Sequence, residues 1–257
     1  MKIGICNGKN NAELIIKNGY DYIEENLTAI GNMSEADFEN LVSFYKEKNI
    51  SVYSTNCFFP GSTTMYETDS LDKIREWVDK AVPRAARLGV KICVLGSGAA
   101  RKFPENTPRE EAEARFTEVV RIIAKKAKEF DIKIAIEPLS FKETNCVNFV
   151  SEAVYFAKKS GCDNVGALVD FFHFYMNGEK DDGLLCARGK LIHAHIARAN
   201  PDRQMPTPEE LPTVIKWANM LKEIDYDGNL SLEGGYGSDF EATIKTTLSV
   251  LSCFKEI

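Results

Sequence analysis

Four side chains that can bind a metal ion stand directly after short, mostly apolar runs in the second half of the chain. They are Glu137, Asp170, His195 and Glu233, which follow residues 134–136, 167–169, 192–194 and 230–232. Three carboxylates and one imidazole are ligands that divalent cations take in proteins. If the four runs are strands that end at the same edge, these side chains can meet around one cation, and that cation can bind oxygen atoms of a substrate.

Eight short runs typical of β-strands recur along the chain, and segments with helical patterns separate them. The runs cover residues 2–7, 20–25, 50–56, 90–95, 132–137, 165–170, 191–196 and 229–233. Alternating strands and helices in 257 residues predict an α/β fold, a closed (β/α)8 TIM barrel, and the competing fold is an open, doubly wound sheet. No linker rich in proline, glycine or serine divides the chain, so we expect a single domain over residues 1–257.

Capping residues mark several of the expected helices. Thr107 and Thr207 each precede a proline and a glutamate, a pattern that predicts a capped helix start. Ser34 gives a weaker signal of the same kind, and Gly89 is expected to end the helix before the fourth strand.

Alternation along the strands predicts where the four candidate ligands point. Residues two apart in a strand face the same side of a sheet. In residues 134–137 the isoleucines share one face, and Ala135 shares the other face with Glu137. The same alternation predicts that all four candidate ligands point to the barrel axis, at the carboxyl ends of the strands, where barrel active sites are built. The alternate residues, Ile192 among them, are expected to face the helices.

Burial of several charges inside one barrel has to be compensated. Unpaired buried charges cost several kcal/mol each, roughly, and a shared cation removes that cost. The alternative is a set of independent ion pairs, which needs basic partners inside the barrel, and we find few candidates. The chain has three histidines, His173, His193 and His195, and His193 is expected to form hydrogen bonds one layer below His195. Of Glu24 and Glu25, only one can face the pocket.

Four segments carry motifs that are specific in combination and in order. They are IleGluProLeuSerPheLysGlu at 136–143, ValAspPhePheHis at 169–173, HisAlaHisIleAla at 193–197 and SerLeuGlu at 231–233. In these motifs the chain resembles the xylose isomerase-like TIM barrels, in particular the branch of sugar isomerases and epimerases that contains the ketose 3-epimerases. The resemblance extends over nearly the whole chain.

The resemblance implies a metal-dependent sugar isomerase or epimerase that acts on a small sugar or polyol. Glu137, Asp170, His195 and Glu233 would bind one divalent cation, with Mn²⁺, Mg²⁺ or Co²⁺ typical and Zn²⁺ also acceptable. Glu137 and Glu233 would also move the proton. The C–H beside the carbonyl of a ketose bound through two oxygens is acidified, and carboxylates on opposite faces can deprotonate and reprotonate it through an enediolate.

The resemblance also implies residues that bind the sugar. Glu143 and His173 would hold substrate hydroxyls, and an arginine after the seventh strand would bind the sugar. Arg203 is the expected arginine, and Arg198 is the alternative. Dimers and tetramers are common in the family, so a homo-oligomer agrees with the resemblance.

Other functions are possible on the same kind of barrel. An inosose dehydratase or a hydroxypyruvate isomerase-type enzyme could use the same metal site. An endonuclease IV-like DNA-repair enzyme is disfavoured, because that branch uses a zinc cluster rich in histidine and this chain has three histidines and a net charge of −6. A sugar-binding barrel without turnover is disfavoured by the intact pair of glutamates.

Two loops are expected near the pocket. The Gly-Ser-Gly turn at residues 96–98, with Arg101 nearby, could bind a phosphate, but an ordinary loop is favoured because one such motif is weak. Phe58 and Phe59 could form an aromatic wall or simply pack the loop, and Cys57 is expected near the pocket.

Composition limits the partners and the cellular location that we expect for the protein. The acidic pI near 5.3 and the scattered basic residues disfavour nucleic acid as a partner. Seven widely spaced cysteines without a CxxC pair disfavour a disulfide framework or zinc ribbon. No apolar stretch approaches the length of a membrane span, and we expect no membrane partner and a cytoplasmic location.

Overall fold

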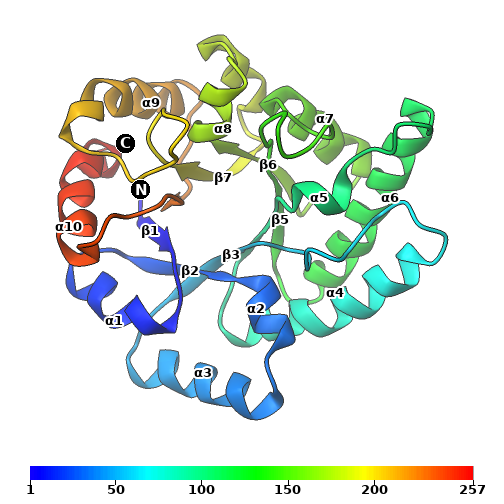
Figure 1. Ribbon diagram of the computed structural model, residues 1–257, viewed down its shortest axis with the longest axis horizontal. Coiled ribbons are helices and arrows are strands. Elements are labelled where there is room, and N and C mark those ends of the chain that lie inside the picture. Colours follow the sequence, from blue (N-terminus) through cyan, green and yellow to red (C-terminus); the bar gives the residue numbers. More distant parts are fainter. Residues whose placement is uncertain (257) are drawn as a thin grey trace.

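The eight strands form a closed parallel barrel in chain order (Figure 1). The computed structural model describes residues 1–256. The strands are β1 (Ile3–Cys6), β2 (Tyr22–Asn26), β3 (Val52–Asn56), β4 (Ile92–Leu95), β5 (Lys133–Ile136), β6 (Val165–Asp170), β7 (Leu191–Ile196) and β8 (Leu230–Leu232). Each strand pairs with the next, and β8 pairs with β1. The predicted single-domain (β/α)8 barrel is therefore confirmed, and the open sheet is excluded.

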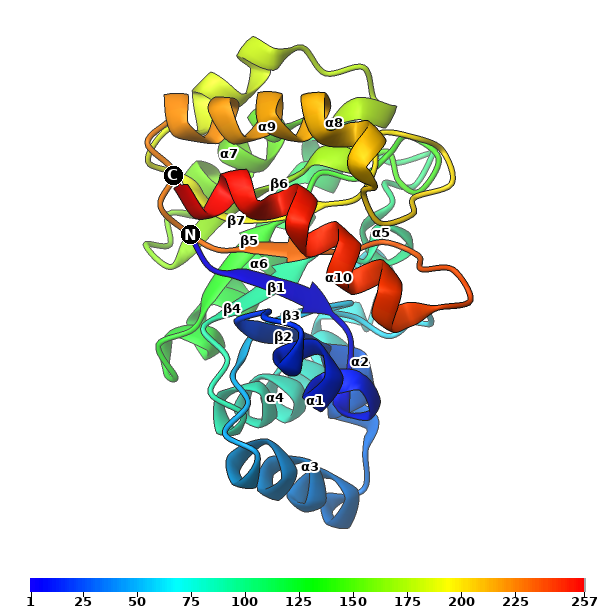
Figure 2. The same cartoon turned by 90° about the vertical axis from the view of Figure 1, so that its left-hand side faces the viewer.

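Helices surround the barrel and connect its strands (Figures 1 and 2). The α-helices are α1 (Lys9–Lys17), α2 (Leu27–Asn32), α3 (Glu35–Glu47), α4 (Ser70–Arg87), α5 (Gly98–Arg101), α6 (Arg109–Lys128), α7 (Val150–Ser160), α8 (Phe171–Met176), α9 (Leu211–Glu223) and α10 (Phe240–Val250). Short 3-10 helices are η1 (Asp181–Ala187), η2 (Pro208–Glu210) and η3 (Leu251–Glu256). None of these helices is long and apolar enough to cross a membrane, as far as residues 1–256 are concerned.

Most of the predicted helix boundaries are confirmed. Ser34 caps α3 by accepting a hydrogen bond from the Asp37 amide at 3.1 Å. Thr207 forms the predicted capping box with Glu210, although the first turn there is the 3-10 helix η2. The prediction for Thr107 is wrong, because Pro108 is extended and takes the capping position itself, so the threonine lies one residue too far from α6.

Two β-bulges change the side-chain alternation inside the barrel. The pairing of β2 with β3 skips Tyr53, and the pairing of β6 with β7 skips Ile192. Both skipped side chains pack against an inner apolar cluster toward the amino-terminal ends of the strands, formed by Ile92, Val94, Ala135 and Leu168. The expectation that Ile192 faces the helices is therefore wrong, because the bulge turns it inward.

Candidate metal centre

The four predicted ligands meet at the carboxyl end of the barrel. Each offers one ligand atom, and these atoms all lie within 4.8 Å of one another. Asp170 ends β6 and His195 lies in β7, while Glu137 and Glu233 directly follow β5 and β8. Glu137, Asp170 and His195 are almost fully buried, and the Glu233 side chain keeps 22% of its surface exposed. The site therefore lies at the inner end of an opening to solvent.

Two cationic groups face the three carboxylates. The Nδ1 atom of His195 lies 2.9 Å from Glu233 Oε2 and 3.3 Å from Glu137 Oε1. The Nη2 atom of Arg203 donates to Asp170 Oδ2 and to Glu233 Oε2, both at 2.8 Å. The negative charge of the carboxylates is thus balanced in part by His195 and in part by Arg203, which lies in the loop after β7.

The charges in the cluster shift the pKa values of its members in different directions. Burial and then the neighbouring Glu233 carboxylate raise the pKa of Glu137. Burial opposes ionisation of Glu233, but His195 and Arg203 outweigh it and lower the pKa of Glu233 to about 2. Burial also opposes the charged form of His195, yet Glu24 and Glu233 raise its pKa well above the usual value. The two glutamates therefore differ in their affinity for a proton.

The cluster fits a hard divalent cation. The Oε1 atom of Glu137 is buried and has no hydrogen-bond donor among the described residues. A buried carboxylate oxygen without a donor is costly, and a cation would satisfy it. Three carboxylates and one imidazole are a donor set that suits Mn²⁺, Mg²⁺ or Co²⁺ better than a thiophilic metal.

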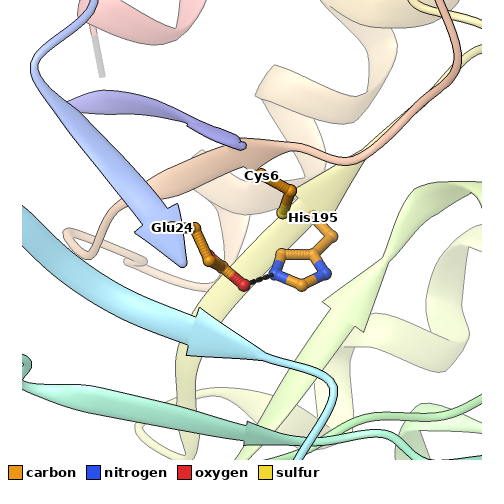
Figure 3. A group of neighbouring side chains, drawn as sticks. All are labelled: Cys6, Glu24 and His195. Carbon is orange, nitrogen blue, oxygen red and sulfur yellow. Dashed lines mark hydrogen bonds and ion pairs between the residues drawn. The ribbon is translucent and has the colours of Figure 1, made fainter. Parts of the chain in front are cut away.

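A second polar layer lies directly below the cluster. The Oε1 atom of Glu24 lies 2.8 Å from His195 Nε2 (Figure 3). Its Oε2 atom accepts from Ser54 Oγ at 2.6 Å, from Ser231 Oγ at 2.6 Å and from His193 Nε2 at 2.8 Å. The expectation that His193 forms hydrogen bonds inside the barrel is confirmed. Burial opposes ionisation of Glu24, but the two histidines outweigh it and lower its pKa well below the usual range.

Glu24 is therefore the member of the Glu24–Glu25 pair that faces the barrel axis. Glu25 lies on the other face of β2 and accepts a hydrogen bond from Tyr45. Sequence reasoning found this alternation but not the contact between Glu24 and His195. No local signal distinguishes Glu24 from Glu25, because both lie within β2 and the sequence does not show which carboxylate faces the histidine.

The loop after β4 shapes the position of Glu137. A Cβ atom on Gly96 would lie 2.2 Å from Glu137 Oε2, so the carboxylate occupies the space that a side chain would need. Arg101 is fully buried, and its guanidinium donates to the carbonyls of Glu137 at 2.5 Å and Leu95 at 3.2 Å. This arginine is committed to the backbone, which agrees with an ordinary structural loop rather than a phosphate site.

A cavity of about 250 Å³ opens onto the carboxylates. Cys57, Phe59, Leu139, Glu143 and Arg203 are among its lining residues. Cys57 thus lies at the pocket, as predicted. The two aromatic residues of that loop differ: Phe59 lines the cavity, whereas Phe58 is fully buried and packs behind it with ring centroids 4.8 Å apart.

His173 and Glu143 lie beside the cluster. His173 is fully buried, and its Nδ1 accepts a hydrogen bond from the Ser140 amide at 3.1 Å. Its Nε2 has no hydrogen-bond partner among the described residues and lies 3.6 Å from Asp170 Oδ2. Glu143 accepts from Ser140 Oγ at 2.9 Å and keeps 43% of its side-chain surface exposed. Glu143 therefore offers a carboxylate at the cavity wall, while His173 is buried beside Asp170.

The two candidate arginines are in different surroundings. The backbone of Arg203 has a left-handed conformation, with φ of 47°, and its side chain reaches the cluster. Arg198 instead pairs with Asp202 at 3.2 Å and lies 3.9 Å from Glu210. The geometry therefore brings Arg203, and not Arg198, to the carboxylates. Asn56 was not predicted, yet its side-chain amide donates to Glu233 Oε1 at 2.9 Å.

Several known proteins are similar to this chain. It is 27% identical over 248 residues to D-psicose 3-epimerase of Agrobacterium fabrum, covering 89% of this chain and 82% of the relative. It is 30% identical over 152 residues to D-psicose 3-epimerase of Enterocloster bolteae, where the match covers 55% of this chain and only 48% of the relative. The fold matches that of 3-keto-D-glucoside 4-epimerase from E. coli with a TM-score of 0.81, at 17% identity and with 98% and 99% of the two chains covered.

The family model described as "Xylose isomerase-like TIM barrel" matches residues 12–252, which is nearly the whole chain. The resemblance seen in the motifs is thus confirmed, and the named relatives are carbohydrate epimerases. This chain belongs to the xylose isomerase-like TIM barrel family.

Proposed function

We propose that the protein is a divalent-metal-dependent ketose 3-epimerase. The observation that carries this proposal is the position of the two glutamates: Glu137 and Glu233 both approach the same imidazole nitrogen of His195, at 3.3 and 2.9 Å. Glu137 follows β5 and Glu233 follows β8, so the carboxylates reach this point from well-separated parts of the barrel wall. Epimerisation needs one group on each face of the reacting carbon, and such an arrangement supplies both.

Glu137, Asp170, His195 and Glu233 would hold the cation. When bound, a divalent cation polarises the carbonyl of a ketose and acidifies the adjacent C–H. Without a cation, Arg203 pairs with both carboxylates: its Nη2 atom lies 2.8 Å from Asp170 Oδ2 and 2.8 Å from Glu233 Oε2. We infer that its guanidinium turns from these carboxylates toward the sugar in the working enzyme, because a cation then neutralises them.

The proton moves between the substrate carbon and the two glutamates. One carboxylate removes the proton from C3, and the other returns a proton to the opposite face. Burial and Glu233 raise the pKa of Glu137, whereas the pKa of Glu233 lies at about 2 despite burial because of His195 and Arg203. The two carboxylates therefore differ in their affinity for a proton, which suits one to act as the acid and the other as the base.

The cavity suits a monosaccharide. Its volume is about 250 Å³, Phe59 and Leu139 offer apolar surface, and Glu143 and Arg203 offer polar groups. We propose that Glu143, His173 and Arg203 bind the sugar hydroxyls. The names of the relatives, D-psicose 3-epimerases among them, support a ketose as substrate.

The test is incubation of the Mn²⁺-loaded enzyme with a panel of ketoses in D₂O. The expected result is deuterium at C3 and formation of the C3 epimer, both of which stop when the metal is chelated and in the Glu137→Gln variant. Loss of water from an inosose would identify a dehydratase instead, and exchange only with hydroxypyruvate would identify that isomerase. Metal-dependent cleavage of abasic DNA, with no exchange in any sugar, would overturn the proposal in favour of a DNA-repair enzyme.

A further inference from the structure

We propose that Glu24 is a positioning residue that fixes the ring of His195, so that Nδ1 of the imidazole faces the three carboxylates. This role rests on the metal site proposed above, which uses His195 as a ligand. Glu24 touches neither the cavity nor the cluster of carboxylates, and it acts only through the histidine.

The contacts of the His195 ring define the role. One nitrogen, Nε2, lies 2.8 Å from Glu24 Oε1, and the other, Nδ1, lies 2.9 Å from Glu233 Oε2. An ionised carboxylate only accepts, so Nε2 donates to Glu24, and in the metal-free cluster Nδ1 likewise donates to Glu233. Nδ1 faces the proposed metal site, so it is the nitrogen that would give up its proton to a cation. A histidine that donates one ring N–H to a carboxylate presents its other nitrogen as a ligand in a fixed tautomer and orientation. Glu24 therefore selects Nδ1 as the ligand atom.

Glu24 is itself held rigidly. It is 1% exposed, and its Oε2 atom accepts from Ser54, Ser231 and His193 at 2.6, 2.6 and 2.8 Å. Ser231 Oγ also lies 2.8 Å from the hydroxyl of Tyr22, which donates to it because the serine proton points to Glu24. Donors from three strands, β3, β7 and β8, thus hold the carboxylate in one place.

Together with Cys6, the residues Glu24 and His195 could instead form a second metal site. Ligand atoms of Cys6, Glu24 and His195 lie within 4.8 Å of one another, and Figure 3 shows the three side chains together. A thiophilic cation could in principle bind there. Both oxygens of Glu24 already accept hydrogen bonds, however, and the His195 nitrogen on this side donates one of them. The contacts therefore favour a support for His195 over a second metal site.

The first test is NMR of the histidine ring nitrogens in the wild-type enzyme, without metal and with Zn²⁺. The chain has three histidines, so the ring signals can be assigned with single variants. The expected result is a slowly exchanging proton on Nε2 of His195 in both states, with Zn²⁺ shifting the Nδ1 signal. A His195 ring whose Nε2 carries no proton in either state would overturn the proposal without any variant having to fold.

The second test compares Glu24→Gln with Glu25→Gln, the same change at the next residue of the same strand. A glutamine can turn its amide N–H toward His195 and favour the opposite tautomer. We expect Mn²⁺ affinity to fall about 10- to 100-fold in Glu24→Gln, with loss of the Nε2 proton signal, and no change of either in Glu25→Gln. Glu24→Asp, which keeps the charge but withdraws the oxygen from Nε2, should also weaken Mn²⁺ binding.

The outcomes separate the two proposals. If the wild type binds no divalent cation, the proposed metal site fails, and the Nε2 proton signal of the metal-free protein still tests Glu24. A folded Glu24→Gln variant with wild-type Mn²⁺ affinity and an unchanged His195 signal would overturn the positioning role. Binding of Cd²⁺ that removes the Nε2 proton and is lost in Cys6→Ala would overturn it in favour of a second metal site.

Discussion

Two polar layers inside the barrel differ in how well the oxygen atoms of their carboxylates are satisfied by hydrogen bonds. The upper layer consists of Glu137, Asp170, His195 and Glu233, and the lower layer of Glu24, Ser54, His193 and Ser231. In the lower layer both oxygens of the carboxylate have close donors. In the upper layer three carboxylates lie close together, and Glu137 Oε1 has no hydrogen-bond donor within residues 1–256. Unsatisfied buried groups cost stability, so the upper layer is where we expect a cation and a substrate to bind, while the lower layer is support.

The largest effect should come from Glu137→Gln in the upper layer. We expect kcat to fall by at least about 1000-fold, because the change removes a proton-transfer group and a metal ligand. The melting temperature of the metal-free protein should stay the same or rise, since burial and Glu233 raise the pKa of this carboxyl and a neutral amide relieves both. Epimerisation assays and thermal unfolding measure the two. A large loss of stability would place Glu137 with the supporting residues.

Arg203→Ala should separate the binding of sugar from the binding of metal. The variant loses a sugar-binding group, so kcat/KM should fall about 10- to 100-fold, mostly through KM. Metal affinity should not fall, because Arg203 competes with a cation for Asp170 and Glu233. Arg198→Ala is the matched control and should behave like the wild type. Equal losses in metal affinity and KM would show that Arg203 serves the upper layer itself.

Gly96→Ala should disturb the upper layer without touching the lower one. The added methyl would lie 2.2 Å from Glu137 Oε2, so the carboxylate has to move. A displacement of about 1 Å at a catalytic group commonly costs on the order of 100-fold in rate. Gly61→Ala is the control, because no atom of the described residues lies within 4 Å of a Cβ added there. Wild-type kcat in Gly96→Ala would mean that Glu137 is not confined by this loop.

The smallest effect on catalysis should come from Ser231→Ala in the lower layer. The change removes one donor to Glu24 and the acceptor of the Tyr22 hydroxyl. We expect a loss of about 1–3 kcal/mol in the free energy of unfolding, measured in urea, and only a few-fold loss of kcat. Ser249→Ala, at an exposed position on α10, is the control. A large kcat loss at unchanged stability would place Ser231 in the catalytic layer.

The sequence predicts the barrel and the meeting of its four candidate ligands because both depend on local patterns. Alternating strands and helices determine the fold, and parity at the strand ends brings the side chains to one axis. The role of Arg203 was predicted only from the family resemblance, because a loop sequence does not show where its side chains lie.

The support below the site was not predictable from the same patterns. The contact between Glu24 and His195 joins β2 to β7, which are not neighbours in the barrel, and it depends on how the strands are staggered across the axis. The orientation of Ile192 was predicted wrongly because a bulge adds one residue to β7, and strict alternation cannot show this. Thr107 failed as a cap because a proline next to it took the position.

The two bulges have a consequence for insertions and deletions in this barrel. Tyr53 and Ile192 are extra residues, and the pairs on either side of each continue as in a regular ladder: Leu191 faces Ala167 and His193 faces Leu168. Removing Ile192 would therefore leave His193 and His195 in register and open space at the base of the barrel. The extra residue lies at the base, below the four candidate ligands, so we expect that strand length can change there while the carboxyl end of the barrel stays aligned.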